Sequence, residues 1–383
     1  MTDHIPDDLS AAGRDLRAYT DELRPLHPLV RNTAGEWVLL RHDLVAAAAR
    51  DDATFSSSVS RHLQVPNGLD GHEHAAFRAV LDPFLSADAL APFVPVFEAV
   101  AAELAASAPR GVTLDAVTGI GALFAVRGQS AWLGWPADLE ERLVGWVAEN
   151  HAATRSGDRL WTQDVAEAFD ELILSVLEPR RAAAAGTGPG DVTVQLMRSR
   201  VHGRPLTDDE IVSVLRNWTG GDLGSIALCV GVLVHRLASD PALQDRLRAG
   251  VSDAEFDAVI DEILRVDDPF VSNRRVTTCP VSVAGVEIPA GARVKLHWTS
   301  ANRDAAVFGD PDAFDPLGNA EANLVYGLGR HVCPGRLLAT LELRIALRAL
   351  LAATTSINLD PNHPAEREVA PVGGWASVPV LLR

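Results

Sequence analysis

A glycine-rich segment near the C-terminus carries the residue with the clearest chemical potential. Residues 326–335 read Tyr-Gly-Leu-Gly-Arg-His-Val-Cys-Pro-Gly, and a stretch of Leu, Ala, Glu and Arg typical of a helix follows. The glycines permit a tight turn that presents the sulfur of Cys333 beside a helix N-terminus, where backbone N–H groups and the helix dipole stabilise a thiolate. The alternative is a buried structural cysteine in a glycine-rich turn.

A second pattern lies upstream of this cysteine. Glu262 and Arg265 stand at i and i+3, so on a helix they share a face and can form an ion pair. Taken alone, such a pair is more often a solvated surface pair than a functional one. The pair becomes informative because it precedes the cysteine segment in the sequence.

Together the two patterns resemble the cytochrome P450 superfamily, in its soluble bacterial class. Segment 326–335 is similar to the family's cysteine loop, Phe-Gly-x-Gly-x-His-x-Cys-x-Gly, at every fixed position but the first, where Tyr326 replaces Phe. Glu262 and Arg265 resemble the family's E-x-x-R pair, although Ala313 stands where the family often has a bracing arginine. The resemblance implies a mainly α fold with small β-sheets, in which a helical bundle with a long central helix encloses haem.

The resemblance also implies the cofactor and the residues that hold it. Haem b is expected, with the thiolate of Cys333 as the iron ligand; such a ligand pushes electron density onto iron and favours O–O cleavage. Charge-assisted hydrogen bonds from several donors suit the two haem propionates. By their place in the family's motifs, these donors are His74, Arg78, Arg275 and His331.

One long helix is predicted over residues 208–238. Thr207 and Glu210 form a capping box at its start, and Asp240 with Pro241 ends it. Glycines at 220, 221, 224 and 231 thin the helix where a bulky object such as a flat cofactor could approach the backbone.

In the family, the central helix carries an acid and an alcohol that relay protons to bound dioxygen. Counting back from Asp240 puts Gly224 at the acid position and Ser225 at the alcohol position. Asp222 lies three residues before Ser225, on nearly the same helix face, and could act as a displaced acid. Alternatively, Asp222 turns to solvent or pairs with an arginine. Residues expected in the substrate pocket are Gly221, Gly224, Phe270 and Val271.

The rest of the chain is expected to form one domain, 1–383. Strands are predicted at 37–40 and 280–296, within β-rich patches of about 25–60 and 270–300, and other regions have helical periodicity. The Gly/Pro/Thr stretch 186–190 is interpreted as a linker between helices because the helical pattern resumes after it. The further predicted helices are 44–49, 94–106, 139–153, 166–185 and 253–266.

Composition excludes several classes of function. A net charge of −17 without a basic tract argues against binding to nucleic-acid phosphates. The first twenty residues lack the charged start and apolar centre of a secretory signal, and the longest apolar run, 226–234, is too short to span a membrane. The three cysteines form no C-x-x-C pair, so neither a zinc site nor a disulfide framework is expected. We therefore expect a soluble, cytoplasmic protein.

Two local features bear on substrate and partner. The stretch between Phe55 and His74 is shorter than the loop that usually covers the family's substrate pocket, which predicts an open pocket for a large or peptide substrate. Within the cysteine segment and the stretch after it, only Glu342 opposes the basic residues, so a ferredoxin or flavodoxin-type electron donor is expected to dock there. The four basic residues are Arg330, Arg336, Arg344 and Arg348.

The function expected from the sequence is that of a haem-thiolate oxidase or monooxygenase of bacterial specialised metabolism. It would hydroxylate or oxidatively cross-link a fairly large, possibly peptide, substrate with electrons from a ferredoxin. One alternative is a peroxide-driven haem-thiolate peroxygenase. Another, from a different class, is a haem protein that binds or senses a ligand without turnover.

Overall fold

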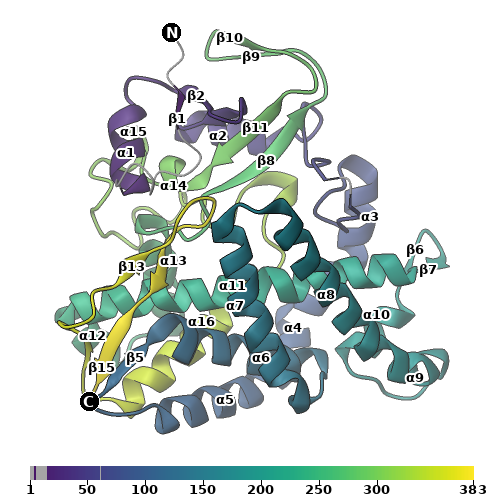
Figure 1. Cartoon of the computed structure of the whole chain (residues 1–383), viewed down its shortest axis with the longest axis vertical. Helices are drawn as coiled ribbons and strands as arrows, with labels where there is room; N and C mark the ends of the chain where they lie inside the picture. The colour runs from purple at the N-terminus through teal and green to yellow at the C-terminus, as the bar shows by residue number, and fades with distance from the viewer. Residues whose placement is uncertain (1–3, 6–14, 61) are drawn as a thin grey trace.

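The computed structural model of the chain describes residues 4–5, 15–60 and 62–383, and shows helices below a smaller β-rich region (Figure 1). In these ranges the strands form five small sheets, so the predicted mainly α fold with small sheets is confirmed. Residues 1–3 and 6–14, which carry much of the expectation that no secretory signal is present, lie outside the described residues.

A single helix, α11 (Asp208–Ser239), crosses the helical region from side to side (Figure 1). Thr207 accepts a hydrogen bond from the backbone of Glu210, and the Glu210 side chain returns one to the backbone of Thr207, which confirms the capping box. The helix has 32 residues and ends at Asp240, because Pro241 starts the next helix, α12 (Pro241–Arg248). Most of its side chains are buried, as expected of a core helix.

Two glycine contacts fix how α11 packs against the segment before α6 (Leu123–Leu133). That segment, Val117–Ala122, is a π-helical turn. A Cβ at Gly121 would lie 2.8 Å from the carbonyl oxygen of Ala227 on α11, so only glycine permits this backbone approach. In return, Gly231 of α11 leaves room for Val117.

The other helices surround α11.

The prediction of one helix over residues 166–185 is wrong. Instead, α8 starts at Arg159, after the N-cap Asp158, and ends at Leu177. Pro179 lacks a backbone N–H, so a 3₁₀ turn, Glu178–Arg180, separates α8 from α9. The helices are α3 (Gly71–Leu81), α4 (Ala87–Leu90), α5 (Val94–Ser107), α7 (Glu140–Ser156), α8 (Arg159–Leu177), α9 (Arg181–Ala185), α10 (Val192–Arg198), α13 (Asp253–Val266) and α16 (Arg336–Ala353).

The two predicted β-rich patches meet in one six-stranded sheet. Its order is β1-β2-β3-β11-β8-β4, in which β11 runs parallel to β3 and antiparallel to β8. The start of β8 lies beside the helical region, so the sheet carries residues toward it. The strands are β1 (His4–Ile5), β2 (Leu29–Asn32), β3 (Trp37–Leu39), β4 (Phe55–Ser56), β8 (Ser272–Thr277) and β11 (Arg293–His297).

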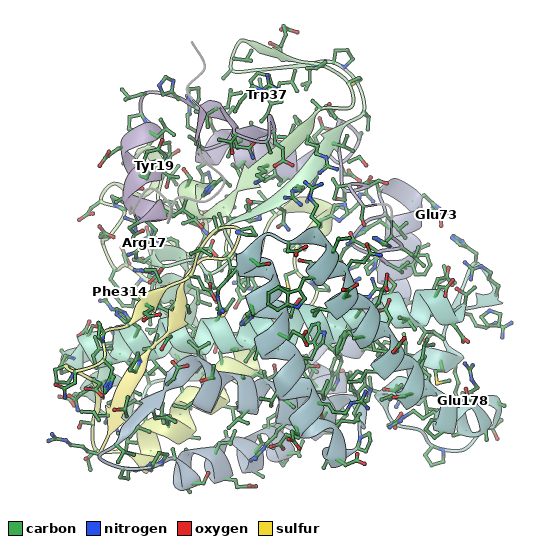
Figure 2. All side chains as sticks on the ribbon, in the orientation of Figure 1. Arg17, Tyr19, Trp37, Glu73, Glu178 and Phe314 are labelled. Atoms are coloured by element: carbon green, nitrogen blue, oxygen red, sulfur yellow. The ribbon has the colours of Figure 1, made fainter. Side chains whose placement is uncertain are left out.

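Short elements complete the molecule. Near the N-terminus, α1 (Leu16–Leu23) carries Arg17 and Tyr19 (Figure 2). Arg17 lies 3.6 Å from Asp267, which ties α1 to the end of α13. The remaining bounds are α2 (His42–Arg50), α14 (Trp298–Ala301), α15 (Ala305–Phe308), β5 (Thr113–Asp115), β6 (Arg200–Val201), β7 (Arg204–Pro205), β9 (Val281–Val283), β10 (Val286–Ile288), β12 (Ile357–Leu359), β13 (Glu366–Arg367), β14 (Trp375–Ser377) and β15 (Pro379–Leu382); the 3₁₀ turns are Asp82–Leu85, Ala91–Phe93, Ala137–Leu139 and Gly329–His331.

Two helical stretches among the described residues are long and apolar enough to cross a membrane by composition, namely Ala87–Ser107 and α11. The second is the central helix and is largely buried within the protein. The first contributes Phe97, Ala101 and Ala105 to the core, where α5 packs against α16.

The close contact at Gly121 leads to a stability prediction. We expect Gly121→Ala to destabilise the fold by about 1–3 kcal/mol, because the added methyl group must push α11 away from the π-helical turn. Gly145→Ala on α7 is the matched control, since a Cβ there meets nothing within 4 Å; it should be neutral or stabilising by about 0.5–1 kcal/mol. Urea unfolding followed by circular dichroism measures both. Equal stability of the two variants would contradict the packing described here.

Candidate functional site

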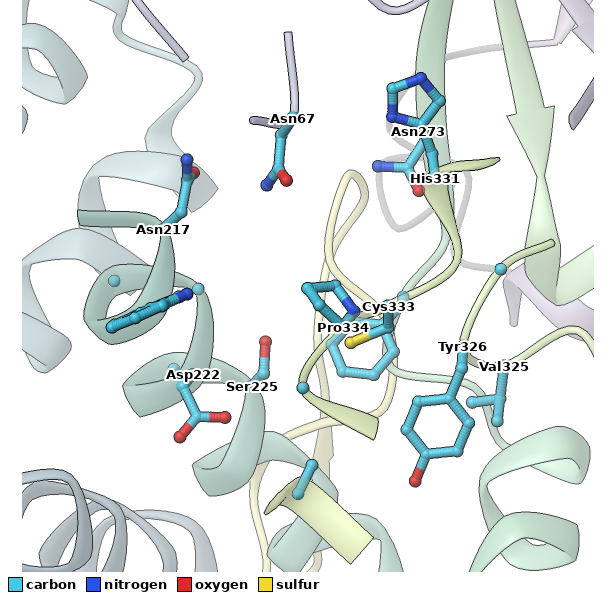
Figure 3. Close-up of a pocket in the computed structure, with 18 of the residues that line it drawn as sticks. Asn67, Asn217, Asp222, Ser225, Asn273, Val325, Tyr326, His331, Cys333 and Pro334 are labelled. Carbon is cyan, nitrogen blue, oxygen red and sulfur yellow. The ribbon is translucent and has the colours of Figure 1, made fainter. Parts of the chain in front are cut away.

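A cavity of about 570 Å³ lies between α11, the cysteine segment 326–335 and the start of β8 (Figure 3). It brings together residues from widely separated parts of the sequence. All predicted site residues except the ion pair line it: His74, Arg78, Gly221, Asp222, Gly224, Ser225, Phe270, Val271, Arg275, His331 and Cys333.

The cysteine segment is a tight loop that directs one sulfur into this cavity (Figure 3). Gly327 and Gly329 adopt φ of +72° and +75°, and a Cβ at Gly329 would lie 2.5 Å from the carbonyl oxygen of Ala49 on α2. The backbone N–H of Cys333 donates to the carbonyl oxygen of Tyr326 at 2.9 Å, which closes the loop. These constraints aim the sulfur at α11.

Cys333 is exposed to the cavity, but the protein around its sulfur still removes part of the solvation of that atom. Loss of solvation raises the pKa of the Cys333 thiol, although the backbone N–H groups of Gly335 and Arg336, at the start of α16, lower it. The N-terminus of α16 therefore lowers the pKa of the thiol by less than the loss of solvation raises it. A thiolate at this position needs a further positive charge, such as that of a metal ion.

One end of the cavity holds nitrogen atoms without partners. His74 is buried on α3, and neither of its ring nitrogens has a hydrogen-bond partner in the described part of the chain. Its ring packs against His331 with centroids 4.3 Å apart, and burial together with nearby cationic groups lowers the pKa of His74 to about 4. A neutral imidazole at this site is therefore free to donate one hydrogen bond to a ligand.

Arg275 is a buried cation at the same end. Among the described residues no carboxylate lies within ion-pair distance of it, and the hydrogen bond from its side chain goes to the carbonyl oxygen of Arg274 at 2.8 Å. Loss of solvation lowers the pKa of its guanidinium. A buried guanidinium without a counter-ion is costly, so this position favours an anionic ligand.

The other two predicted donors are already engaged. The Nε2 atom of His331 lies 3.2 Å from Asp70 Oδ1 and 3.1 Å from Ser57 Oγ. Arg78 pairs through Nε with Asp82, and its Nη1 donates to the carbonyl oxygen of Val332 at 3.1 Å. These contacts hold His331 and Arg78 at the rim of the cavity, where they add positive potential and donors to the site around His74 and Arg275.

Glu262 and Arg265 form a fully buried ion pair on α13. Arg265 Nε donates to Glu262 Oε2 at 2.7 Å and Nη2 to Oε1 at 2.8 Å, in a bidentate arrangement. No arginine at position 313 braces the pair; instead, Arg265 Nη2 donates to the backbone carbonyl of Ala313 at 2.9 Å. Asn319 Nδ2 and the backbone N–H of Asp315 donate to Glu262 Oε1 at 2.7 and 3.0 Å.

On α11, Asp222 and Ser225 point in different directions. The hydroxyl of Ser225 projects into the cavity, whereas the carboxylate of Asp222 turns away from it (Figure 3). Asp222 accepts a hydrogen bond from Gln129 Nε2 on α6. The alternative in which Asp222 faces solvent or pairs with an arginine is therefore wrong, because an amide of a neighbouring helix is its partner.

A second carboxyl group lies close behind Asp222. Glu342 on α16 is completely buried, and neither of its oxygens has a partner within the described ranges. Burial raises the pKa of Asp222 to about 7, and burial together with the charge of Asp222 raises the pKa of Glu342 well above its ordinary value. Sequence reasoning missed Gln129, and it took Glu342 for a surface charge, because the heptad-like pattern of α16 does not mark a buried acid.

The glycines of α11 serve mainly to admit protein side chains. Gly231 receives Val117, while a Cβ at Gly220 would lie 3.2 Å from Trp146 and one at Gly224 would lie 2.9 Å from Nε2 of His151. The prediction that these three glycines leave room for a flat cofactor is wrong, because protein side chains occupy that room. Gly220, Gly221 and Gly224 all line the cavity, but of these three only Gly221 has nothing within 4 Å of an added Cβ.

The short loop over the cavity is fastened to α11. The backbone N–H of Val65 donates to Ser213 Oγ at 2.8 Å, and Asn217 Nδ2 donates to the carbonyl oxygen of Val65 at 2.7 Å. Ser213 Oγ in turn donates to the carbonyl oxygen of Leu63 at 3.1 Å. These three hydrogen bonds fix the position of residues 63–65 against the central helix.

Comparison with known proteins identifies the arrangement. A family profile described as Cytochrome P450 matches residues 158–356. The cyclomarin C epoxidase of Salinispora arenicola is 32% identical over 88% of both chains, and the erythromycin C-12 hydroxylase of Saccharopolyspora erythraea is 30% identical over 94% of this chain and 92% of its own. The chain belongs to the cytochrome P450 family. A solved open form of the P450 EryK from S. erythraea superposes with a TM-score of 0.88 at 27% identity, covering 99% of this chain and 98% of that one.

The residues of this P450 fit the haem that the family implies. Cys333 presents its sulfur to the cavity, and the unpartnered nitrogens of His74 and the uncompensated charge of Arg275 lie where carboxylates would be stabilised. Iron would supply the positive charge that a poorly solvated thiolate requires. The free nitrogens of His74 and the guanidinium of Arg275 are thus groups that haem propionates would satisfy. The enzyme is a cytochrome P450 oxidoreductase.

The basic residues near the cysteine of this P450 are not free cations. The sequence suggested that only Glu342 opposes them, and this is wrong, because Glu342 is buried and aspartates of α13 and of the segment before β4 lie alongside. The pairs are Arg330 with Asp52 (2.8 Å), Arg336 with Asp261 (2.7 Å), Arg344 with Asp257 and with Asp253 (3.4 Å), and Arg348 with Asp253 (2.6 Å).

The buried ion pair leads to a prediction on folding. Glu262→Ala leaves Arg265 without its counter-ion in the core, and we expect a loss of about 3–5 kcal/mol in stability. The variant should be poorly soluble or recovered without haem. Asp253→Ala, which removes an exposed partner of Arg348, should change stability by less than about 1 kcal/mol. Unfolding curves and haem content measure both, and a stable, haem-loaded Glu262→Ala protein would contradict the role given to the pair.

The raised pKa of Asp222 predicts a pH-dependent effect on stability. The unfolded carboxyl loses its proton near pH 4, whereas the folded one keeps it to about pH 7, so wild-type stability falls as pH rises across this window. Asp222→Asn removes this titration, and its stability relative to wild type should increase between about pH 4 and pH 7. Urea unfolding at several pH values measures the difference. For the control Ser225→Ala, the free energy of unfolding should change with pH in the same way as for wild type. If the same were true of Asp222→Asn, the pKa of the Asp222 carboxyl would not be raised in the folded protein.

Proposed function

We propose that this P450 is a haem-thiolate monooxygenase of bacterial specialised metabolism that hydroxylates or oxidatively cross-links a fairly large, polar substrate such as a peptide. The observation that carries the proposal is the pairing, in one cavity, of a projecting cysteine sulfur with the buried guanidinium of Arg275, which has no carboxylate of the described residues within ion-pair distance. The names of the two curated relatives, an epoxidase and a hydroxylase, support this reaction class.

In this proposal Cys333 holds the iron of haem b, and four donors hold its propionates. When bound, haem activates dioxygen with two electrons and two protons, so that one oxygen atom enters the substrate and the other leaves as water. His74 and Arg275 contribute the unsatisfied donors. The full set of propionate donors is His74, Arg78, Arg275 and His331.

We assign proton handling to the α11 face of the cavity. Ser225 presents its hydroxyl to the cavity, where it can accept and pass on a proton (Figure 3). Asp222 acts from behind: with a pKa of about 7, its carboxyl is present in both protonation states near neutral pH. It must break its hydrogen bond to Gln129 to reach the cavity, so its part is that of a buried proton store rather than a direct donor.

The cavity lining supports a neutral, polar substrate. Asn67, Asn150, Thr154 and Asn217 surround the space beyond the α11 face, and these groups hydrogen-bond amides and hydroxyls without carrying charge. Phe270 and Val271 add apolar surface near the sulfur. Such a mixture suits a macrocycle or peptide better than a hydrocarbon. The short stretch between Phe55 and His74, of which Ser57, Pro66 and Asn67 line the cavity, is consistent with a substrate of that size.

We further propose that a ferredoxin or flavodoxin-type protein supplies the electrons in the cytoplasm. It would dock near Arg330, Arg336, Arg344 and Arg348. Because these arginines are ion-paired, an acidic partner must exchange their aspartates for its own carboxylates. The net attraction is therefore weaker than four free charges would give, and docking should depend less on ionic strength than it would with four free charges.

The thiolate ligand is tested by the spectrum of the ferrous protein with carbon monoxide. Wild type should absorb at the position characteristic of thiolate ligation, and Cys333→Ala should lose that band. Cys279→Ala is the control, because Cys279 is exposed and does not line the cavity. Persistence of the band in Cys333→Ala would overturn the proposal. NADPH turnover with a ferredoxin then separates a monooxygenase from a peroxygenase, which would use peroxide alone at a matching rate.

A further inference from the structure

A histidine of α7 occupies the notch that Gly224 leaves in α11. The Nε2 atom of His151 would lie 2.9 Å from a Cβ at Gly224, so any other residue at that position would displace the imidazole. His151 also lines the cavity, between Asn150 and Thr154 of the same helix turn. Gly224 is the position at which the family pattern places an acid. A titratable side chain therefore stands there after all, but it comes from a different helix.

The neighbouring notch shows that packing alone does not require a histidine. Gly220, one turn earlier, receives Trp146 of α7, whose ring stacks on Phe169 with centroids 3.9 Å apart and whose Nε1 donates to the carbonyl oxygen of Val165. Trp146 does not line the cavity and is satisfied by protein contacts. His151 differs because it lines the cavity, next to the uncharged Asn150 and Thr154.

Burial and two charged neighbours, Arg155 and Glu368, determine the protonation of this imidazole. Burial lowers the pKa of His151, and Arg155 lowers it further, while Glu368 opposes them. Arg155 forms a bidentate ion pair with Glu368, with Nη2 to Oε1 at 2.8 Å, which ties the end of α7 to the segment after β13. A neutral imidazole has one nitrogen that donates and one that accepts, so it can receive a proton at one nitrogen while it passes one on from the other.

We propose that His151, seated over Gly224, takes the place of the carboxylate missing from α11 and exchanges protons with the cavity beside Ser225. The inference rests on the proposed monooxygenase function and names a residue for its proton supply. Oxygen insertion consumes one substrate molecule, one dioxygen, two electrons from the ferredoxin-type donor and two protons, and yields oxidised product and water. His151 delivers a proton from one ring nitrogen and regains one from solvent in the cavity.

Because His151 occupies the space beside Gly224, the proposal can be tested by moving the titratable side chain from position 151 to position 224. His151→Ala should slow NADPH oxidation, measured with a surrogate ferredoxin and no added substrate, by roughly 10²-fold, as expected for loss of a general acid. The double variant His151→Ala/Gly224→Asp places a carboxylate in the vacated space and should recover most of the rate. His151→Ala/Gly224→Ala fills the same space without an acid and should stay slow.

Two further measurements separate chemistry from folding. Trp146→Phe retains the aromatic packing at Gly220 and should oxidise NADPH at the wild-type rate. Thermal unfolding of the two double variants without haem should be similar, because the alanine and the aspartate at position 224 both occupy space that the imidazole vacates. In the haem-free protein, ring nitrogen NMR shifts should show His151 neutral at pH 7.

Each outcome decides between the alternatives. Equal rates for the two double variants would overturn the inference, since filling the notch would then be all that matters. An imidazole that remains protonated above pH 7 would overturn it as well. Wild-type protein that binds haem but oxidises no NADPH with any ferredoxin would instead overturn the proposed function, and this inference with it.

Discussion

The buried pair of Glu262 and Arg265 is the interaction on which the rest of the structure depends. Removing two charges from water is expensive, and the pair is stable only because its other hydrogen-bonding groups are filled. Arg265 donates to the backbone carbonyls of Asn302 and Ala313, and Glu262 receives donors from residues 315 and 319. One helical turn of α13 thereby holds the irregular stretch 302–319 in place.

That stretch leads directly into the cysteine segment. Asn302 links the two, because its side chain accepts from the backbone N–H of Leu324 at 2.7 Å and donates to the buried carboxyl of Asp268. Burial raises the pKa of Asp268 well above its ordinary value, so this carboxyl behaves as a neutral hydrogen-bonding group. The position of the sulfur is therefore set by a chain of buried polar contacts rather than by apolar packing, which is less directional.

The sequence was most informative where local patterns determine local structure. The capping box at Thr207, the end of α11 at Asp240 and the bounds of α13 follow from residues that satisfy or terminate helix hydrogen bonds, and each was predicted. The cysteine loop was recognisable because its glycines are needed for close backbone approach. What the sequence could not reveal were contacts between helices far apart in the chain. Gln129 against Asp222, Glu342 in the core, and aspartates of α13 beside arginines of α16 have no local signature.

The paired notches at Gly220 and Gly224 restrict how this enzyme can change during evolution. Trp146 and His151 are five residues apart on α7, whereas the glycines that receive them are four apart on α11, so the two helices are held in a single register. An insertion or deletion in α7 between these residues would misplace both side chains at once. Divergence toward new substrates is thus easier by single replacements on the cavity face of α7, at positions such as Asn150 and Thr154, than by changes in the length of that helix.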